Sequence, residues 1–206
     1  LTITGTDLDL TNEIIFGGNK KVSAFVSKTA TQIVVVVPAD AQDGKIKLVP
    51  LSGVEVESAA DLIMVVPTIT NITPNPAKTG ANITIQGTNL DLVTSVVFGG
   101  NTTGEIQTGG SATAITVKVP SNAIAGAVTL NTAANKSVVS SSALNLVKPA
   151  ISSIAPLTLL TKEAITITGT NLDIVDSVIF TGNKAVKITG ATETEIVVTV
   201  PAGSKS

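Results

Sequence analysis

The sequence predicts an all-β protein made of three tandem antiparallel β-sandwiches. Three observations lead to this prediction: a block of residues that recurs every 82 positions, an alternation of apolar and polar side chains, and turn-forming residues about every ten positions. The block occupies residues 1–9 (LTITGTDLD), 83–91 (ITIQGTNLD) and 165–173 (ITITGTNLD). Because the period is constant, we expect three copies of one small domain.

The repeat also predicts the domain boundaries, at residues 1–66, 67–148 and 149–206. A proline-led segment opens the second and third copies, as PTITNITP at 67–74 and PAISSIAP at 149–156. The first copy has no such opening, and the third ends shortly after Pro201. We therefore expect the first domain to lack its first strand and the third its last two, and the chain to be a piece of a longer polypeptide, since a missing strand leaves an edge and part of a core uncovered.

The strands are clearest in the second copy, where apolar side chains alternate with polar ones and the alternation stops at Pro120. About seven such strands per copy are typical of an immunoglobulin-type sandwich. Its core is expected to be aliphatic, with one phenylalanine per copy at the aligned positions Phe16, Phe98 and Phe180. The side chains predicted to point inward are Val96, Phe98, Ile115, Val117, Val119, Val128, Leu130, Leu144 and Leu146, with Val178 beside Phe180 in the third copy.

The composition excludes several classes of function. The chain has no His, Cys, Trp, Tyr or Arg, its 13 basic residues are all Lys, and its net charge is −2. The usual zinc sites and nucleophile–base pairs need His or Cys, and nucleic-acid binding needs a basic surface. We therefore expect no enzyme activity, no catalytic, cofactor-binding or metal-binding residue, no cofactor and no nucleic-acid partner.

Two kinds of turn deserve comparison with binding sites. Aspartates follow the glycine turns and could be calcium ligands. Calcium needs six to eight oxygen ligands, and the second copy has one aspartate in its turn, so we interpret these aspartates as solvated turn residues. The aspartates concerned are Asp7, Asp9, Asp91, Asp173 and Asp176. The Gly-Gly-Asn sequences at 17–19 and 99–101 resemble phosphate loops, but no helix follows them, so they are predicted to be hairpin turns with positive φ.

Direct sugar binding is not expected, because such sites generally offer an exposed aromatic ring. Phe25 is the one phenylalanine outside the repeat, and we expect it to fill a gap in the first copy. The lysines Lys20, Lys21, Lys45 and Lys47 are predicted to be solvated.

Four motifs keep their order and spacing through the chain: Gly-Thr-Asn-Leu at 87–90, Val-Phe-Gly-Gly-Asn at 97–101, the strand 115–120 ending in proline, and Gly-Ala-Val-Thr-Leu at 126–130. Together they resemble the IPT/TIG family of immunoglobulin-like domains. The first copy departs at Asp7, in place of Asn89, and the third at Thr181, in place of Gly99.

The resemblance implies immunoglobulin-like β-sandwiches and says little about function, because the family occurs in many kinds of protein. Tandem arrays of this kind are similar to the N-terminal stalk of Bacteroidetes surface glycan-binding lipoproteins. The tripeptide 176–178 (Asp-Ser-Val) also resembles a Bacteroidetes O-glycosylation acceptor.

These observations predict a non-catalytic spacer, or stalk, of a multidomain cell-surface protein used in polysaccharide capture. It would contact polysaccharide through a domain outside this segment and the outer membrane through a lipid anchor outside it, as an exported bacterial monomer. Three copies joined by short proline-containing junctions would give a semi-rigid rod on the order of 100 Å long. Two alternatives remain: an adhesion array that contacts a protein partner, and accessory domains of an extracellular polysaccharide-degrading enzyme.

Overall fold

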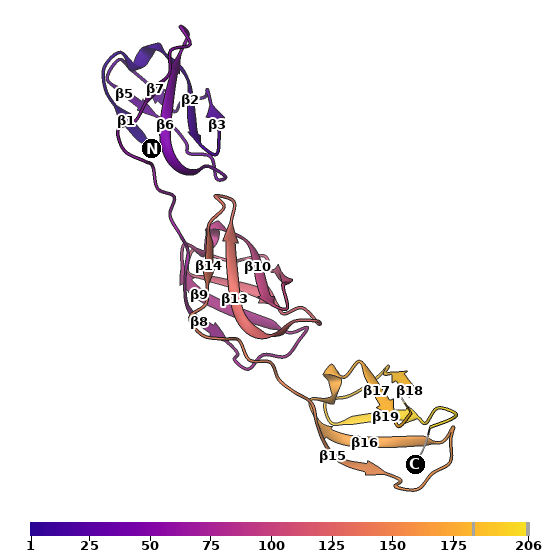
Figure 1. Cartoon of the computed structure of the whole chain (residues 1–206). Coiled ribbons are helices and arrows are strands. Elements are labelled where there is room, and N and C mark those ends of the chain that lie inside the picture. Colours follow the sequence, from indigo (N-terminus) through magenta and orange to yellow (C-terminus); the bar gives the residue numbers. More distant parts are fainter. Residues whose placement is uncertain (183, 205–206) are drawn as a thin grey trace. The chain divides into compact units, whose positions relative to one another are not determined.

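A computed structural model of the chain describes residues 1–182 and 184–204. Apart from short 3-10 helices, the regular structure of these residues consists of β-strands whose pairing is antiparallel (Figure 1), which confirms the predicted all-β, immunoglobulin-like class. The chain divides into two compact units, Leu1–Pro74 with Asn82–Leu144, and Asn75–Ala81 with Asn145–Ser206. Within the described residues, no helix is both long and apolar enough to cross a membrane.

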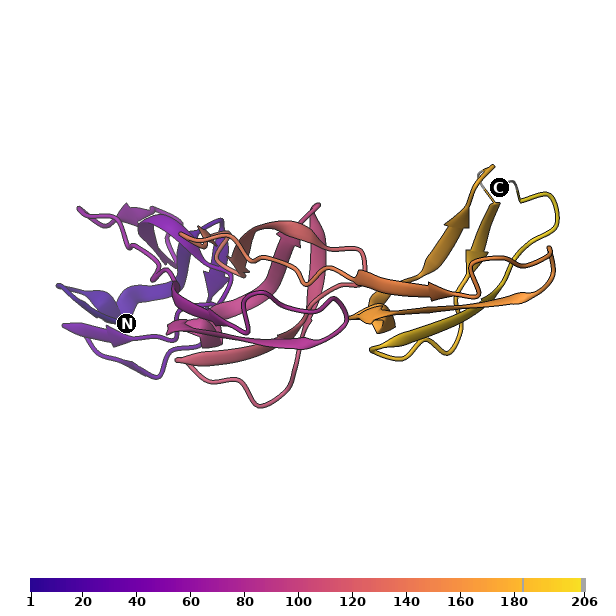
Figure 2. The same cartoon turned by 90° about the horizontal axis from the view of Figure 1, so that it is seen from below.

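The second repeat (residues 67–148) has seven strands that fold into two layers. One layer consists of β8, β9 and β12, and the other of β10, β13 and β14 (Figures 1 and 2). Strand β11 belongs to both, since its first half pairs with β10 and its second half with β12. The strands are β8 (Thr68–Thr73), β9 (Asn82–Thr88), β10 (Val93–Gly99), β11 (Thr102–Ile106), β12 (Ala114–Lys118), β13 (Ile124–Thr132) and β14 (Ser137–Val139).

The core of the second repeat lies between these layers and is formed by alternate residues of each strand. The predicted inward side chains from Val96 to Leu144 are at most 4% exposed, and Leu146 is half-buried. Gly104 lies against the ring of Phe98, and a Cβ built on Gly104 would overlap that ring. Gly104 on the neighbouring strand β11 has no side chain, and this leaves room for the ring of Phe98.

The glycine of the repeated block is explained by a close crossing of two strands. Strand β8 has a bulge between Ile69 and Asn71, and a Cβ on Gly87 of β9 would overlap the carbonyl oxygen of Thr68. The third repeat has the same crossing, where a Cβ on Gly169 would overlap the carbonyl oxygen of Ala150. Glycine is needed at this position because the backbones approach each other, and no positive φ is involved.

The first repeat (residues 1–66) forms two sheets, in the orders β1-β5-β4 and β3-β2-β6-β7. No described strand corresponds to β8 there. Its core contains Ile14, Phe16 and Ile33, and Phe25 packs against this core, as predicted. The strands are β1 (Thr2–Thr4), β2 (Thr11–Gly17), β3 (Lys20–Val22), β4 (Ser27–Lys28), β5 (Gln32–Val34), β6 (Gln42–Pro50) and β7 (Val56–Glu57).

The third repeat (residues 149–206) forms the sheets β15-β16-β19 and β17-β18. Among the described residues it has no counterparts of β13 and β14. Val178 and Phe180 pack against the core of this repeat, as the alternation predicts, and they are half-buried, whereas Val96 and Phe98 are fully enclosed. The strands are β15 (Ala150–Ala155), β16 (Ala164–Thr170), β17 (Ser177–Phe180), β18 (Lys184–Lys187) and β19 (Glu195–Thr199).

Replacing Phe98 by alanine should lower the free energy of unfolding of the second repeat by about 3–5 kcal/mol, because the ring is 3% exposed and its loss leaves a cavity. Hydrogen exchange of the β10 and β13 amides measures this change. Val139→Ala is the matched control, since Val139 is 59% exposed. Equal protection in the two variants would show that Phe98 is not a core anchor.

Replacing Gly87 by alanine should lower the free energy of unfolding of the second repeat by about 1–3 kcal/mol, because the new methyl group would force β8 and β9 apart. The equivalent change at Gly5 is the control, since a Cβ there meets only the flexible side chain of Leu8, at 3.3 Å or more. Chemical denaturation of the two variants should separate them, with Gly5→Ala close to the parent chain. Equal losses of stability would contradict the crossing as the reason for glycine.

Candidate functional site

The acidic turns are backbone structures that lead into three short 3-10 helices, Leu8–Leu10, Leu90–Leu92 and Leu172–Ile174. Each helix is preceded by a residue in the left-handed conformation, with φ of 55° at Asp7 and 53° at Asn89 and Asn171. Asn and Asp tolerate this conformation better than other residues with a side chain. Asp7 therefore replaces Asn89 at little cost, and the leucine that follows each of them is buried.

The aspartates of these turns are not gathered into a metal site. Asp9, Asp91 and Asp173 are exposed and occupy the same position in three different repeats, and Asp176 is exposed nearby in the chain. Among residues 1–182 and 184–204, no three His, Cys, Asp or Glu side chains lie close enough to hold a metal ion.

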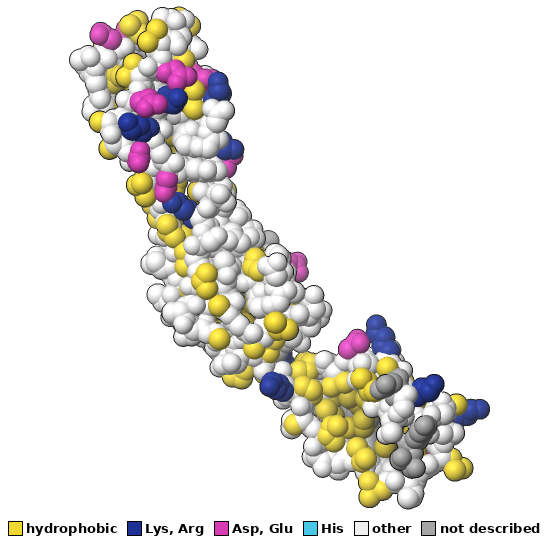
Figure 3. All heavy atoms as spheres, in the orientation of Figure 1, with side chains coloured by type: hydrophobic (Ala, Val, Ile, Leu, Met, Phe, Trp, Pro, Cys, Tyr) yellow, Lys and Arg dark blue, Asp and Glu magenta, His cyan; other side chains and the backbone are white. Residues whose placement is uncertain are grey.

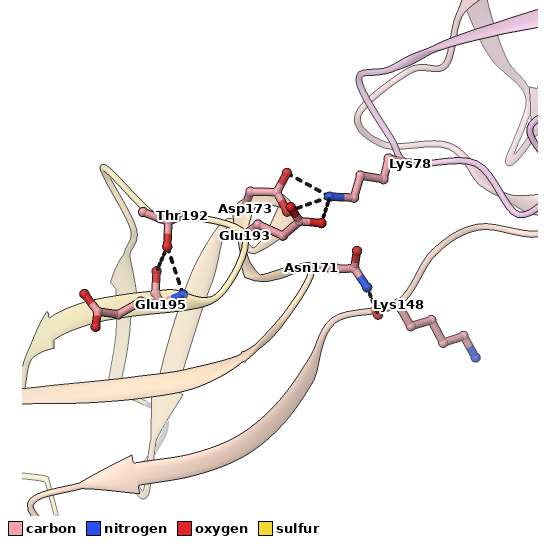
Figure 4. Close-up of polar contacts among 7 residues, drawn as sticks. All are labelled: Lys78, Lys148, Asn171, Asp173, Thr192, Glu193 and Glu195. Carbon is pink, nitrogen blue, oxygen red and sulfur yellow. Dashed lines mark hydrogen bonds and ion pairs between the residues drawn. The ribbon is translucent and has the colours of Figure 1, made fainter.

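One turn aspartate takes part in an ion-pair cluster that the sequence did not predict (Figure 4). Lys78 lies in the segment Asn75–Ala81, which belongs to the same compact unit as the third repeat. Its Nζ donates to both carboxylate oxygens of Asp173, at 3.1 and 3.2 Å, and to Oε1 of Glu193, at 3.1 Å. Asp173, and secondly Glu193, raises the pKa of Lys78 above its usual value. The carboxylate of Asp173 is thus ion-paired rather than only solvated.

A second ion pair joins Asp43 and Lys136, both in the other compact unit. Asp43 also accepts a hydrogen bond from the backbone N–H of Met64, at 2.8 Å. The hydrogen bond from Lys136, followed by that from Met64, lowers the pKa of Asp43. Solvent screens ion pairs as exposed as these, so they contribute little to stability.

The lysines predicted to be solvated lie on the surface of the first repeat and also form ion pairs there, where Figure 3 shows acidic and basic side chains close together. Lys47 bonds Glu55 at 2.9 Å and lies 3.5 Å from Glu57, and these two glutamates raise its pKa, Glu55 more strongly. The other pairs are Lys20–Asp40 at 2.6 Å, Lys21–Glu13 at 3.0 Å and Lys45–Glu57 at 3.8 Å. Because the charges neutralise one another, this face offers no basic patch.

The Gly-Gly-Asn sequences are hairpin turns, as predicted. Gly18 and Asn19 connect β2 to β3 with φ of 74° and 59°, and Gly100 and Asn101 connect β10 to β11 with φ of 78° and 59°. Positive φ at both positions is the requirement of a type I′ turn, so the residue types are accounted for by the backbone.

Phe25 offers no open ring for stacking on a sugar. It is half-buried against the first core, and Nζ of Lys28 lies 5.5 Å from the centre of its ring. In the Asp-Ser-Val tripeptide, Ser177 is exposed at the start of β17.

A groove of about 560 Å³ runs along β1 in the first repeat and was not predicted. Its lining includes residues 3–7 on one side and, on the other, apolar side chains of β6 and β7 such as Ile46, Leu48 and Val56. The groove is built mainly from apolar side chains and backbone, with Asp7 and Glu57 as its charged residues.

The ion-pair cluster of Lys78, Asp173 and Glu193 has no signal within the sequence of a single repeat. The position of Lys78 is occupied by Leu160 in the next repeat, 82 residues later. Glu193 takes the place of Ala112, because the carbonyl of each accepts the N–H of the buried leucine of its repeat. The signal for this cluster lies in the charged residues that one repeat has and the aligned positions of the next repeat lack.

Comparison with known proteins places the chain in a family. The family model of the IPT/TIG domain matches residues 67–147 and 149–206, which is more than half of the chain. No curated protein sequence matches the chain.

Several solved structures resemble the chain at low identity. The surface glycan-binding protein PbSGBP-B from Prevotella bryantii is 20% identical over 70% of this chain and 38% of its own, with a TM-score of 0.35. SGBP-B of the Bacteroides ovatus mixed-linkage glucan utilization locus, in complex with a mixed-linkage heptasaccharide, is 17% identical over 100% of this chain and 55% of its own, with a TM-score of 0.35. The plexin A4 extracellular region is 19% identical over 98% of this chain and 19% of its own, with a TM-score of 0.40.

The chain thus spans between about one fifth and just over half of the length of these three proteins. Its family follows from the match to the IPT/TIG family model, which covers the second and third repeats. These are the repeats in which a glycine lies at the strand crossing and a buried leucine follows the left-handed turn residue. The chain belongs to the IPT/TIG family of immunoglobulin-like domains.

Proposed function

We propose that residues 1–206 are a non-catalytic spacer in a larger bacterial cell-surface protein and that they present a carbohydrate-binding domain lying outside this segment. The observation that supports this most is the use of the aromatic side chains. The chain has four phenylalanines and no Trp or Tyr. Phe16 and Phe98 are buried, and Phe25 and Phe180 are half-buried against their cores. A spacer needs its rings for stability, whereas a sugar site needs them on its surface.

The polar side chains also support a role without chemistry of their own. Catalysis by His or Cys is impossible in a chain that has neither residue. The lysines and acids of the first repeat neutralise one another in surface pairs. The remaining polar surface is rich in Thr, Ser and Asn, whose hydrogen bonds to a sugar would replace bonds to water at a net gain of only about 0.5–1.5 kcal/mol each.

The finer parts of the proposal concern location and partners. The likeness of the motif order to the stalks of Bacteroidetes surface glycan-binding proteins supports export to the bacterial surface, a lipid anchor outside this segment, and polysaccharide as the partner of the full protein. The exposed Ser177 in its Asp-Ser-Val context supports export as well. We propose that the segment acts as a monomer.

A second candidate function is an adhesion array that contacts a protein partner through its flat surfaces or sheet edges. The two functions differ in where the affinity for polysaccharide resides, and this can be measured.

We predict that residues 1–206 show no measurable affinity for glucans, mannans or xyloglucans, and that the full-length protein binds at least one of them. Affinity electrophoresis of both proteins against the same panel gives the comparison, with Phe25→Leu as the control for the half-buried ring. Retardation of the segment that is lost in Phe25→Leu would place sugar binding within it. Retardation of neither protein would favour the adhesion array.

A further inference from the structure

The segment Asn75–Ala81 belongs to the second repeat by sequence and to the compact unit of the third repeat by its contacts. Its backbone pairs with the chain that leads into the third repeat. The N–H of Ala77 donates to the carbonyl of Asn145, and the N–H of Val147 donates to the carbonyl of Ala77, each at 2.9 Å. Ala77 is fully buried. This short parallel pairing fixes the backbone next to Lys78.

The two acids that Lys78 contacts are held beside each other by the backbone of the third repeat. The N–H of Leu172 donates to the carbonyl of Glu193 at 2.9 Å, so the short helix that contains Asp173 is bound to the loop that contains Glu193. The loop is held by the hydroxyl of Thr192, which accepts a backbone N–H three residues later, at 2.9 Å (Figure 4). Because both carboxylates are already brought to one place, less freedom is lost when Lys78 pairs with them.

The lysine and the second acid are additions to the common fold of the repeats. Asp173 recurs in every repeat, but the position of Glu193 is occupied by Ala112 in the second, since each carbonyl accepts the N–H of the buried leucine of its repeat. The position of Lys78 is occupied by Leu160 in the third repeat. The fold of a single repeat therefore needs neither Lys78 nor Glu193, and the two residues occur as the two sides of one contact.

Lys78 is held more closely than a lysine in a single surface pair. Its Nζ lies within 3.2 Å of three carboxylate oxygens that belong to two residues, and its side chain is 28% exposed. An ammonium group has three hydrogens to donate, and each of these oxygens can accept one. A network of this kind contributes more to stability than an isolated exposed pair does.

We propose that residues 75–81 form a clamp, a segment of the second repeat that stabilises the third repeat through the contact of Lys78 with Asp173 and Glu193. The backbone pairing of the segment positions the lysine, and the ion pairs hold the turn at 171–175 against the loop at 191–195. The stability of the third repeat thus depends on a residue outside its own sequence. This inference goes beyond the spacer function and does not depend on it, because it concerns contacts within one compact unit and no ligand.

The direct test is hydrogen exchange of residues 1–206 carrying Lys78→Met, which removes the charge and keeps most of the aliphatic chain. The amide of Leu172 should exchange faster than in the parent chain by about threefold or more, since its partner loop is less firmly held. Exchange at Ile115 and Val117 should not change, which verifies that the second repeat is intact. Lys118→Met, at an exposed lysine of the second repeat, is the matched control and should leave Leu172 unaffected. Equal exchange of Leu172 in the two variants would overturn the proposal.

A charge exchange tests the pairing itself. Lys78→Glu alone should speed exchange at Leu172 more than Lys78→Met does, because three acids then face one another. Asp173→Lys alone should also speed it. Combining Lys78→Glu with Asp173→Lys places the positive charge on the third repeat between two acids, and exchange should return to within about twofold of the parent chain. If the two changes simply add, the contact is not what stabilises the third repeat.

Salt tests the clamp in the unmodified chain. Raising the salt concentration from about 0.1 M to about 1 M shortens the screening length from about 10 Å to about 3 Å. Exchange at Leu172 should therefore become faster in the parent chain and approach the rate in Lys78→Met, whose own rate should depend little on salt. The same salt dependence in both proteins would overturn the proposal.

Discussion

The strand crossing at the repeated glycine is the constraint on which each complete repeat depends. Strand β8 lies so close to β9 that any side chain at Gly87 would overlap the Thr68 carbonyl oxygen. In this repeat β8 pairs with β9, and Val128 and Leu130 in the opposite layer are fully buried. Where no such strand is described, in the first repeat, the equivalent Leu48 is half-buried and a groove of about 560 Å³ is present. Closure of the aliphatic core therefore follows from one small residue.

The described cores are built mainly from aliphatic side chains, and this determines what the surface can offer. Their large side chains are Val, Ile, Leu and one phenylalanine per repeat, and no buried side-chain N or O atom in the described residues lacks a hydrogen-bond partner. With these rings buried or half-buried, the surface carries small polar groups, paired charges and scattered apolar side chains such as Leu51 and Leu157. This surface agrees with the spacer role proposed above.

Much of the fold could be predicted from the sequence. The alternation of apolar and polar residues indicates which side chains point inward, and the 82-residue period indicates which positions are equivalent in the three repeats. The inward positions from Val96 to Leu144 and the positive φ of Asn19 and Asn101 are of this kind. The lesser burial of Phe180 follows from the same alignment, because no counterparts of β13 and β14 are described in its repeat. The cluster of Lys78, Asp173 and Glu193 was hidden for another reason, because its residues come from distant segments. Asp173 recurs in every repeat, but Lys78 and Glu193 do not, since the aligned positions hold Leu160 and Ala112.

Hydrogen exchange of residues 1–206 tests the central claim, that closure by a first strand stabilises each sandwich. Strands β5 and β12 are the informative pair, since both pair with the strand that carries the repeated glycine, β5 with β1 and β12 with β9. The amides of Ile115 and Val117 in β12 should exchange more slowly than those of Ile33 and Val34 in β5, under conditions where exchange reports the free energy of opening. Equal or greater protection in β5 would contradict the claim and show that the core is stable without the covering strand.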